Sequence, residues 1–215
     1  MASRQARKSI PKDGVSLWAP VNARVRDRER KRDAVILVAA RAFRERGYHN
    51  TSLDDIASEL NVTKPTVYHY VANKEQLLFE CFRAGLHQIM EAFEQIRNAN
   101  EDARTRLGAV VTRYAEAITS DFGWCMVQAE NQDLSPAMSR KVKALKSEID
   151  QGIRQLLKEG IADGSIRDCD AKMAAFAIAG ALNWIAHWYR SDEPLAAAQI
   201  AERYLQLFEL GLRPR

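Results

Sequence analysis

The side chains best suited to recognising another molecule lie in one short stretch, KPTVYHY at positions 64–70. It places a lysine, a threonine, a histidine and two tyrosines around a single aliphatic residue, Val67. An ammonium group such as that of Lys64 can bind guanine O6 and N7 or a phosphate, and Thr66 can contact a thymine methyl group. About two helical turns of this composition are too short and too polar to build a core. The residue types instead suit a helix that enters the major groove of DNA, with Thr63, Lys64, Thr66, Tyr68, His69 and Tyr70 as candidate contacts.

The residues before this stretch predict a first short helix and a tight turn. Ser52 and Asp55 have the spacing of a capping box, in which each side chain bonds a free N–H at the helix start. Ile56 and Leu60, four residues apart, give the helix one apolar stripe. Asn61 then interrupts the helix, because asparagine tolerates the left-handed conformation of a turn.

The residues that follow predict the second helix and the start of a third. Thr63 is suited to cap the second helix, and Pro65 falls in its first turn, where a missing N–H costs nothing. Asn73 and Gln76 have the spacing of a cap for a helix that begins NKEQLLF. Two short helices joined by a tight turn describe a helix-turn-helix. The alternative is an αα-hairpin in a larger bundle whose second helix is simply solvated.

A preceding helix completes a small N-terminal domain over residues 26–78. Asp27 to Arg46 places apolar residues on one face, and Gly47 stands just after the end, where glycine is favoured. The predicted shared core consists of Ile36, Phe43, Leu53, Ile56, Leu60, Val67, Leu77 and Leu78. Residues 1–25 lack helical periodicity and are expected to form a basic arm that is disordered or loosely packed.

The remaining residues, 79–215, predict further helices and no strands, so the expected fold is all-α. The helix that starts at Lys74 runs without a breaker through Ile96 and connects the two domains. The later expected elements are Leu107–Ile118, a short segment capped by Asp121, Met138–Glu159 closed by Gly160, a strongly apolar helix after Asp170, and Leu195–Leu212.

Charge is distributed unevenly along the 215 residues. Residues 1–75 carry 15 Lys and Arg against 9 Asp and Glu, whereas the other 140 carry 17 against 19. A basic N-terminal third fits a polyanion-binding domain, although an ordinary basic tail would give the same excess. Three isolated cysteines and the absence of a signal peptide or membrane-length apolar run lead us to expect a cytoplasmic protein with reduced thiols and no membrane association.

Residues 34–78, AVILVAARAFRERGYHNTSLDDIASELNVTKPTVYHYVANKEQLL, resemble the TetR family of bacterial transcriptional regulators. The shared pattern includes the alanines and Phe of the first helix, Gly-Tyr, the Thr-Ser cap, Asp-Ile-Ala and Lys-Glu-x-Leu-Leu. Pro65 departs from it, because the family more often has a small residue there. The resemblance implies that Thr51, Ser52 and Lys74 clamp the DNA backbone and that Tyr68 and Tyr70 divide phosphate contact and core packing between them. Core filling alone is an equally good interpretation of Tyr70.

The resemblance also implies a homodimer that binds a double-stranded DNA operator and responds to a small-molecule effector in its C-terminal domain. The last two helices would pair in the dimer. Residues 181–212, ALNWIAHWYRSDEPLAAAQIAERYLQLFELGL, look like the tail of regulators of lipid or steroid catabolism, some of which answer to acyl-CoA thioesters. The expected function is therefore a repressor released from its operator by an apolar or acyl-CoA-type effector.

Four residues are candidates for effector binding: Trp124, Met126, Asn183 and His187. Asn183 and His187 are polar, four residues apart, and lie on an otherwise apolar helix, where buried polar groups require partners. The competing interpretation is that all four residues fill the core or the dimer interface.

Enzymatic interpretations find little support in the sequence. The four histidines, at 49, 69, 87 and 187, have no metal-binding spacing, and the chain contains neither a phosphate-binding glycine loop nor a nucleophile elbow. We therefore expect no catalysis, no metal and no cofactor. The remaining alternatives are an architectural DNA-binding dimer without an effector and a helical ligand carrier.

Overall fold

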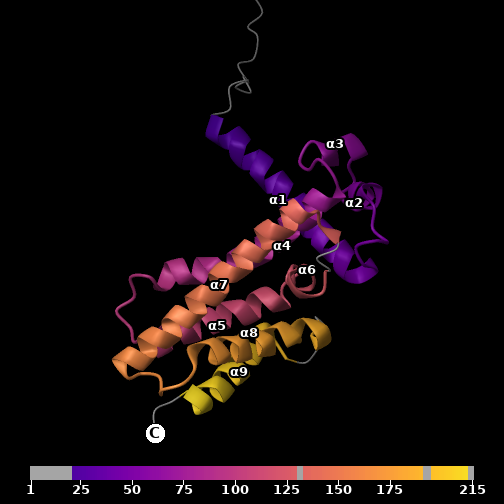
Figure 1. The fold of residues 1–215 in the computed structure, drawn as a ribbon. Coiled ribbons are helices and arrows are strands. Elements are labelled where there is room, and N and C mark those ends of the chain that lie inside the picture. Colours follow the sequence, from indigo (N-terminus) through magenta and orange to yellow (C-terminus); the bar gives the residue numbers. More distant parts are fainter. Residues whose placement is uncertain (1–20, 130–132, 191–194, 213–215) are drawn as a thin grey trace, which may run out of the picture.

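The computed structural model describes residues 21–129, 133–190 and 195–212, and within them the chain forms only helices (Figure 1). The all-α prediction is confirmed for this part of the chain. In order the helices are α1 (Val21–Arg46), α2 (Leu53–Glu59), α3 (Lys64–Tyr68), α4 (Lys74–Ile96), α5 (Ala103–Thr119), α6 (Gly123–Val127), α7 (Pro136–Asp163), α8 (Ala171–Trp188) and α9 (Ala197–Leu212).

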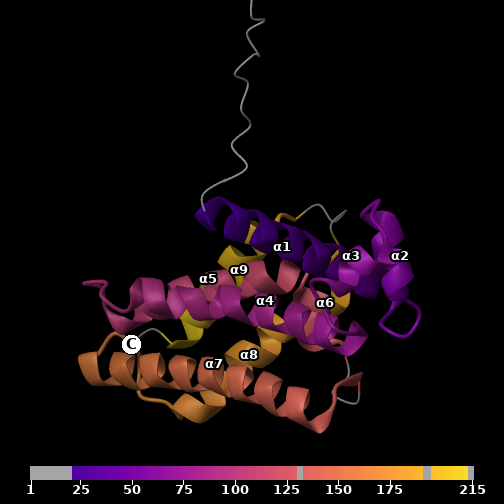
Figure 2. The same ribbon diagram turned by 90° about the horizontal axis from the view of Figure 1, so that it is seen from above.

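The short helices α2 and α3 lie at one end of the molecule, beside α1 and the start of α4 (Figures 1 and 2). Helices α4, α5 and α7 pack against one another through the body, and α8 and α9 cover it on one side. None of the described helices is both long and apolar enough to cross a membrane.

Helix α4 belongs to both domains. Its first turns bury Leu77, Leu78 and Phe82 completely, and the Cys81 thiol donates a hydrogen bond to the Ile36 carbonyl of α1 at 3.5 Å. Its later turns bury further apolar residues against α5 and α7, and the buried side chains form one continuous core. The boundary placed after residue 78 therefore falls inside a continuous helix, as the unbroken pattern from Lys74 to Ile96 predicts.

Two expectations about the N-terminal domain require correction. Helix α1 begins at Val21 rather than Asp27, so the last residues of the expected 1–25 arm are helical, and residues 1–20 lie outside the described part of the chain. Leu60 is half-buried at the end of α2, whereas the other seven predicted core residues are buried.

Helix α7 runs past the glycine that was expected to close it. Gly160 is an interior residue, and a Cβ there would lie 2.5 Å from Cδ1 of Ile166. This glycine is therefore needed for close packing against the returning chain. The helix ends instead at Gly164, which has a φ of 78°, a conformation that glycine adopts without the strain of a side chain.

The turn between α5 and α6 is closed tightly. The backbone N–H of Gly123 donates to the Ser120 carbonyl at 3.1 Å, and the Ser120 hydroxyl donates to the Ala117 carbonyl at 2.7 Å. A Cβ at Gly123 would lie 1.7 Å from the carbonyl oxygen of Ile118, which is a backbone atom with little freedom to move. Asp121 does not cap α6 as expected, because Phe122 occupies the capping position and makes no side-chain cap bond.

This geometry predicts different costs for two glycine substitutions. We expect Gly123→Ala to lower the free energy of unfolding by about 3 kcal/mol or more, because backbone must move to admit the methyl group. Gly85→Ala is the matched control. Its Cβ would meet the flexible Met126 side chain at 2.4 Å, and we expect a cost of about 1–2 kcal/mol. Urea unfolding of both variants measures the difference, and equal costs would contradict the rigid turn.

Candidate nucleic-acid interface and effector site

The turn between α2 and α3 is built as the sequence predicts. The Ser52 backbone N–H donates to the Asp55 carboxylate at 2.7 Å, and the Asp55 N–H donates to the Ser52 hydroxyl at 3.1 Å. Asn61 has a φ of 53°, the left-handed conformation expected for the turn. Hydrogen bonds from the Ser52 hydroxyl and N–H hold the pKa of the Asp55 carboxyl below its ordinary value. The capping box therefore stabilises the fold fully when the pH is above the ordinary pKa of an aspartate. This contribution is lost as the pH falls through the lower pKa that Asp55 has in the folded protein.

Helix α3 is attached to the domain through one face. Val67 is completely buried, while Lys64, Thr66, Tyr68 and His69 are exposed. Thr63 occupies the capping position but makes no cap bond, because its hydroxyl pairs with that of Thr66 at 2.9 Å. The exposed face of α3 can therefore carry polar contacts to a partner.

Tyr68, the last residue of α3, and Tyr70, just beyond it, occupy different environments. Tyr68 is 47% exposed, whereas Tyr70 is half-buried and packs against the core. The His69 ring meets Tyr70 edge-on at 5.2 Å. Tyr68 is thus placed to contact a partner, and Tyr70 is placed to support α3.

A groove of about 370 Å³ lies beside α3 and collects five of the predicted DNA contacts: Thr51, Ser52, Lys64, Tyr68 and Lys74. Four of the five already have partners in the domain, and of these four Thr51 and Lys74 are the least exposed. The Thr51 hydroxyl is buried and donates to the carbonyls of Gly47 and Ala42 at 2.9 and 3.3 Å. The Lys74 ammonium lies 4.2 Å above the Tyr48 ring, and burial lowers its pKa.

Asp54 is a functional candidate that the sequence analysis missed. It lines the same groove, and its carboxylate accepts a hydrogen bond from the Lys64 ammonium at 2.6 Å. A carboxylate ten residues from its lysine partner has no helical spacing, so only the fold brings the pair together. Any phosphate or base that Lys64 binds must compete with this carboxylate for the three N–H donors of the ammonium group.

Comparison with known proteins identifies both domains. Residues 35–81 match the model for bacterial regulatory proteins of the tetR family, and residues 100–212 match the model for the tetracyclin repressor-like C-terminal domain. The chain belongs to the TetR family. It is accordingly a helix-turn-helix, DNA-binding transcriptional regulator rather than an enzyme.

Relatives match this chain over more than four fifths of its length. The HTH-type transcriptional repressor KstR2 of Rhodococcus jostii is 29% identical over 188 residues, covering 85% of this chain and 91% of that protein. The ketosteroid regulator KstR2 of Mycobacterium tuberculosis superposes with a TM-score of 0.76 at 26% identity, covering 86% and 96% of the two chains. AibR in complex with isovaleryl coenzyme A and operator DNA gives a TM-score of 0.71 at 26% identity, covering 82% and 97%.

The four predicted effector residues do not share one site. Trp124 and His187 line a cavity of about 240 Å³ at the ends of α5, α6 and α8, which we call the boundary cavity. Met126 is buried and fills the space beside Gly85. Asn183 accepts a hydrogen bond from the Tyr114 hydroxyl at 3.1 Å, and burial raises the pKa of Tyr114 to about 12. Asn183 thus has the polar partner that it requires, supplied by α5.

The boundary cavity is also lined by Arg44 of α1. This residue belongs to the N-terminal helix-turn-helix domain, residues 26–78, which we call the DNA-reading domain. The neighbouring carboxylate is Asp121, which lies 3.3 Å from Arg44 and 2.9 Å from Arg41. Sequence reasoning missed both arginines, since about 80 residues separate them from their partner and no local pattern connects the three.

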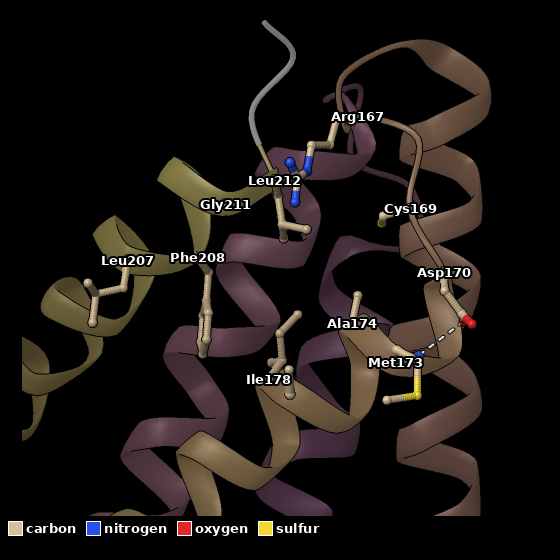
Figure 3. A pocket seen from close by; sticks show the side chains of 11 residues that line it. Arg167, Cys169, Asp170, Met173, Ala174, Ile178, Leu207, Phe208, Gly211 and Leu212 are labelled. Carbon is tan, nitrogen blue, oxygen red and sulfur yellow. Dashed lines mark hydrogen bonds between the residues drawn. The ribbon is translucent and has the colours of Figure 1, made fainter.

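A second cavity, of about 360 Å³, opens between α8 and α9 (Figure 3). Phe208 and Ile178 point into it, and Met173 and Leu207 stand at its edge. The surrounding faces of α8 and α9 expose large apolar side chains: Met173, Phe176, Trp184, Trp188, Leu207 and Leu210. Leu210 is 82% exposed, so these two faces leave large apolar side chains open to solvent in the single chain.

The Asp54–Lys64 pair predicts that removing one negative charge strengthens DNA binding. We expect Asp54→Asn to raise operator affinity about twofold to fivefold, because Lys64 is released and a repulsive charge is lost. Glu94→Gln is the control, with the same charge change at an exposed site on the far end of α4. Fluorescence anisotropy with a labelled operator at two salt concentrations measures the effect. A loss of affinity in Asp54→Asn would show that this carboxylate positions Lys64 rather than restrains it.

Proposed function

We propose that this TetR-family regulator is a dimeric repressor that leaves its operator when a small acyl-bearing effector binds the C-terminal domain. The observation that supports it most directly is the exposed polar face of α3 beside a groove that gathers five predicted DNA contacts. The names of the relatives support the repressor role and the effector class. KstR2 is a transcriptional repressor, and AibR has been solved with isovaleryl coenzyme A and operator DNA.

In this proposal α3 enters the major groove. Thr66, Tyr68 and His69 are exposed and face the bases, and Lys64 binds a guanine or a phosphate after leaving Asp54. Ser52 at the start of α2 and Lys74 at the start of α4 contact the phosphate backbone from the adjoining groove. Thr51 and Tyr70 support these contacts from within the domain.

The dimer would form through α8 and α9. Their exposed apolar side chains require cover, and a two-fold symmetric contact presents the same surface from both chains. A dimer also places two copies of α3 on one face, as an operator with two half-sites about 34 Å apart requires.

The effector would bind near α6, where Trp124 and His187 line the boundary cavity. It releases the operator only if it binds the DNA-incompetent arrangement more tightly, and a coupling of about 1–3 kcal/mol is sufficient. An architectural DNA-binding dimer, the alternative function, would bind DNA equally well with and without small molecules.

The effector test uses an operator selected from a random duplex pool. We expect isovaleryl coenzyme A or a longer acyl-CoA to lower operator affinity and to raise the melting temperature of the protein, because a ligand at 100 times its Kd stabilises the bound state by about 2.7 kcal/mol. Coenzyme A alone is the control for the acyl group. A panel of acyl-CoAs and carboxylic acids extends the test. If no member of the panel changes the operator affinity, the result would favour the architectural alternative.

The dimer test uses a charge on α8. We expect Trp184→Glu to convert the dimer to monomer at micromolar concentration, because Trp184 is 62% exposed in the isolated chain and would be buried in the dimer. Val25→Glu is the matched control, since Val25 is also an exposed apolar residue, 48% exposed, but lies on α1. Sedimentation velocity distinguishes the two states, and a Trp184→Glu variant that remains dimeric would move the interface elsewhere.

A further inference from the structure

A cluster of two arginines and one aspartate links α1 of the N-terminal domain to the turn between α5 and α6. The Nε of Arg41 lies 2.9 Å from Oδ2 of Asp121. The Nη1 of Arg44 lies 3.3 Å from the other carboxylate oxygen, Oδ1. Two guanidinium groups thus share one carboxylate, and one positive charge is left in excess where α1 meets the α5–α6 turn. All three side chains are partly exposed, so an ion arriving from solvent can reach them.

Asp121 is the fixed member of this cluster. It stands on the turn closed by Ser120 and Gly123, where the chain approaches the Ile118 carbonyl too closely to admit a side chain. The arginines have long, flexible side chains on α1. Both arginines belong to the last turns of α1, so an exchange of partners releases this end of α1 from the turn while Asp121 stays in place.

Arg44 also lines the boundary cavity, and of the described lining residues it alone comes from the DNA-reading domain. The others come from the α5, α6 and α8 ends and include His187, Trp124 and Tyr189. The hydroxyls of Thr119 and Ser120 already donate to carbonyls of α5. Among the described lining residues there are one guanidinium, one imidazole and no carboxylate, so the cavity favours an anion.

We propose that the boundary cavity binds the carboxylate or phosphate group of the effector, and that this group takes Arg44 from Asp121. A guanidinium accepts both groups in the same two-pronged geometry. The volume of about 240 Å³ is below the 300–1,000 Å³ usual for whole drug-sized ligands. The cavity therefore takes a small organic acid, or the charged end of a larger molecule, with its flat or apolar part against Trp124.

The exchange has a direct route to the DNA-reading helices. Arg44 lies three residues before Gly47, whose carbonyl accepts the Thr51 hydroxyl at 2.9 Å, and the Ala42 carbonyl accepts it at 3.3 Å. Thr51 is followed at once by the Ser52 cap of α2. A shift at the end of α1 is thus carried into α2 and α3. This consequence rests on the proposed repressor function, whereas the binding site does not.

The test is isothermal titration of the full chain with four probes: inorganic phosphate, sodium isovalerate, coenzyme A and isovaleryl coenzyme A. We expect at least one to bind the wild type, and Arg44→Gln to weaken that binding about tenfold to a hundredfold through loss of charge-assisted hydrogen bonds. We expect Asp121→Asn to strengthen it, because the competing carboxylate is removed. Phosphate or coenzyme A binding identifies a phosphate ligand, and isovalerate binding identifies a carboxylate.

Arg113→Gln is the matched control. Arg113 lies on α5, pairs with Glu116 at 2.6 Å and does not line the cavity. Thermal unfolding of each variant establishes that it is folded. The inference is overturned if no probe binds the wild type, or if Arg44→Gln binds as tightly as Arg113→Gln. It is also overturned if Asp121→Asn weakens binding.

Operator binding separates this inference from the proposed function. A probe that binds through Arg44 but leaves operator affinity unchanged supports the site and contradicts effector-driven release. A probe that releases the operator equally from wild type and Arg44→Gln supports release and overturns the site at Arg44.

Discussion

The structure depends on one constraint, the burial of a single continuous helix in both domains. Leu77 and Leu78 of α4 are completely buried in the DNA-reading domain, and Phe82 and Ile89 are completely buried further along the same helix. Because interiors pack at the density of organic crystals, such a helix cannot slide or bend at one end without disturbing its neighbours at the other. The reading helices are consequently held at a defined place relative to the surface that α8 and α9 present, and any signal between them must use contacts that can exchange at low cost.

The contacts at the domain boundary are of that kind. The core around α4 is mostly apolar, and its buried Glu80 carboxylate pairs with Arg32 of α1 at 2.7 Å. The contacts at its surface are polar and partly exposed: Arg41 and Arg44 with Asp121, and the Ser135 N–H donating to the Glu75 carboxylate at 2.7 Å. Exposed ion pairs contribute little net stability, because water competes for both partners. They can therefore change partners without unfolding the protein. Under the proposed function, exchangeable contacts beside a fixed core are where a bound effector would act.

The DNA-reading surface follows the same division between fixed and exchangeable parts. Val67, Thr51 and Tyr70 hold α3 from the inside, while Tyr68 and His69 face outward. Lys64 is neither wholly fixed nor free, because its ammonium group is exposed but donates to the Asp54 carboxylate. In the proposed DNA contact, an acidic residue beside Lys64 would lower general affinity for polyanions and favour those sequences whose bases or phosphates fit Lys64 well.

Local sequence alone determined the helical class, the capping box of α2, the turn at Asn61, the cap at Asn73 and most of the small core, because each depends on residues within a few positions of one another. Local sequence also predicted which side chains of α3 are exposed, because they surround the single buried Val67. Tertiary structure decided what local pattern cannot encode: that α7 passes Gly160, that Asp121 pairs with α1 instead of capping α6, that Asn183 is satisfied by Tyr114, and that only Trp124 and His187 share a cavity. Each of these outcomes depends on which side chain, distant in the sequence, packs against the residue. A polar residue on an apolar helix has the same local sequence whether its partner is a tyrosine of the core or a bound ligand.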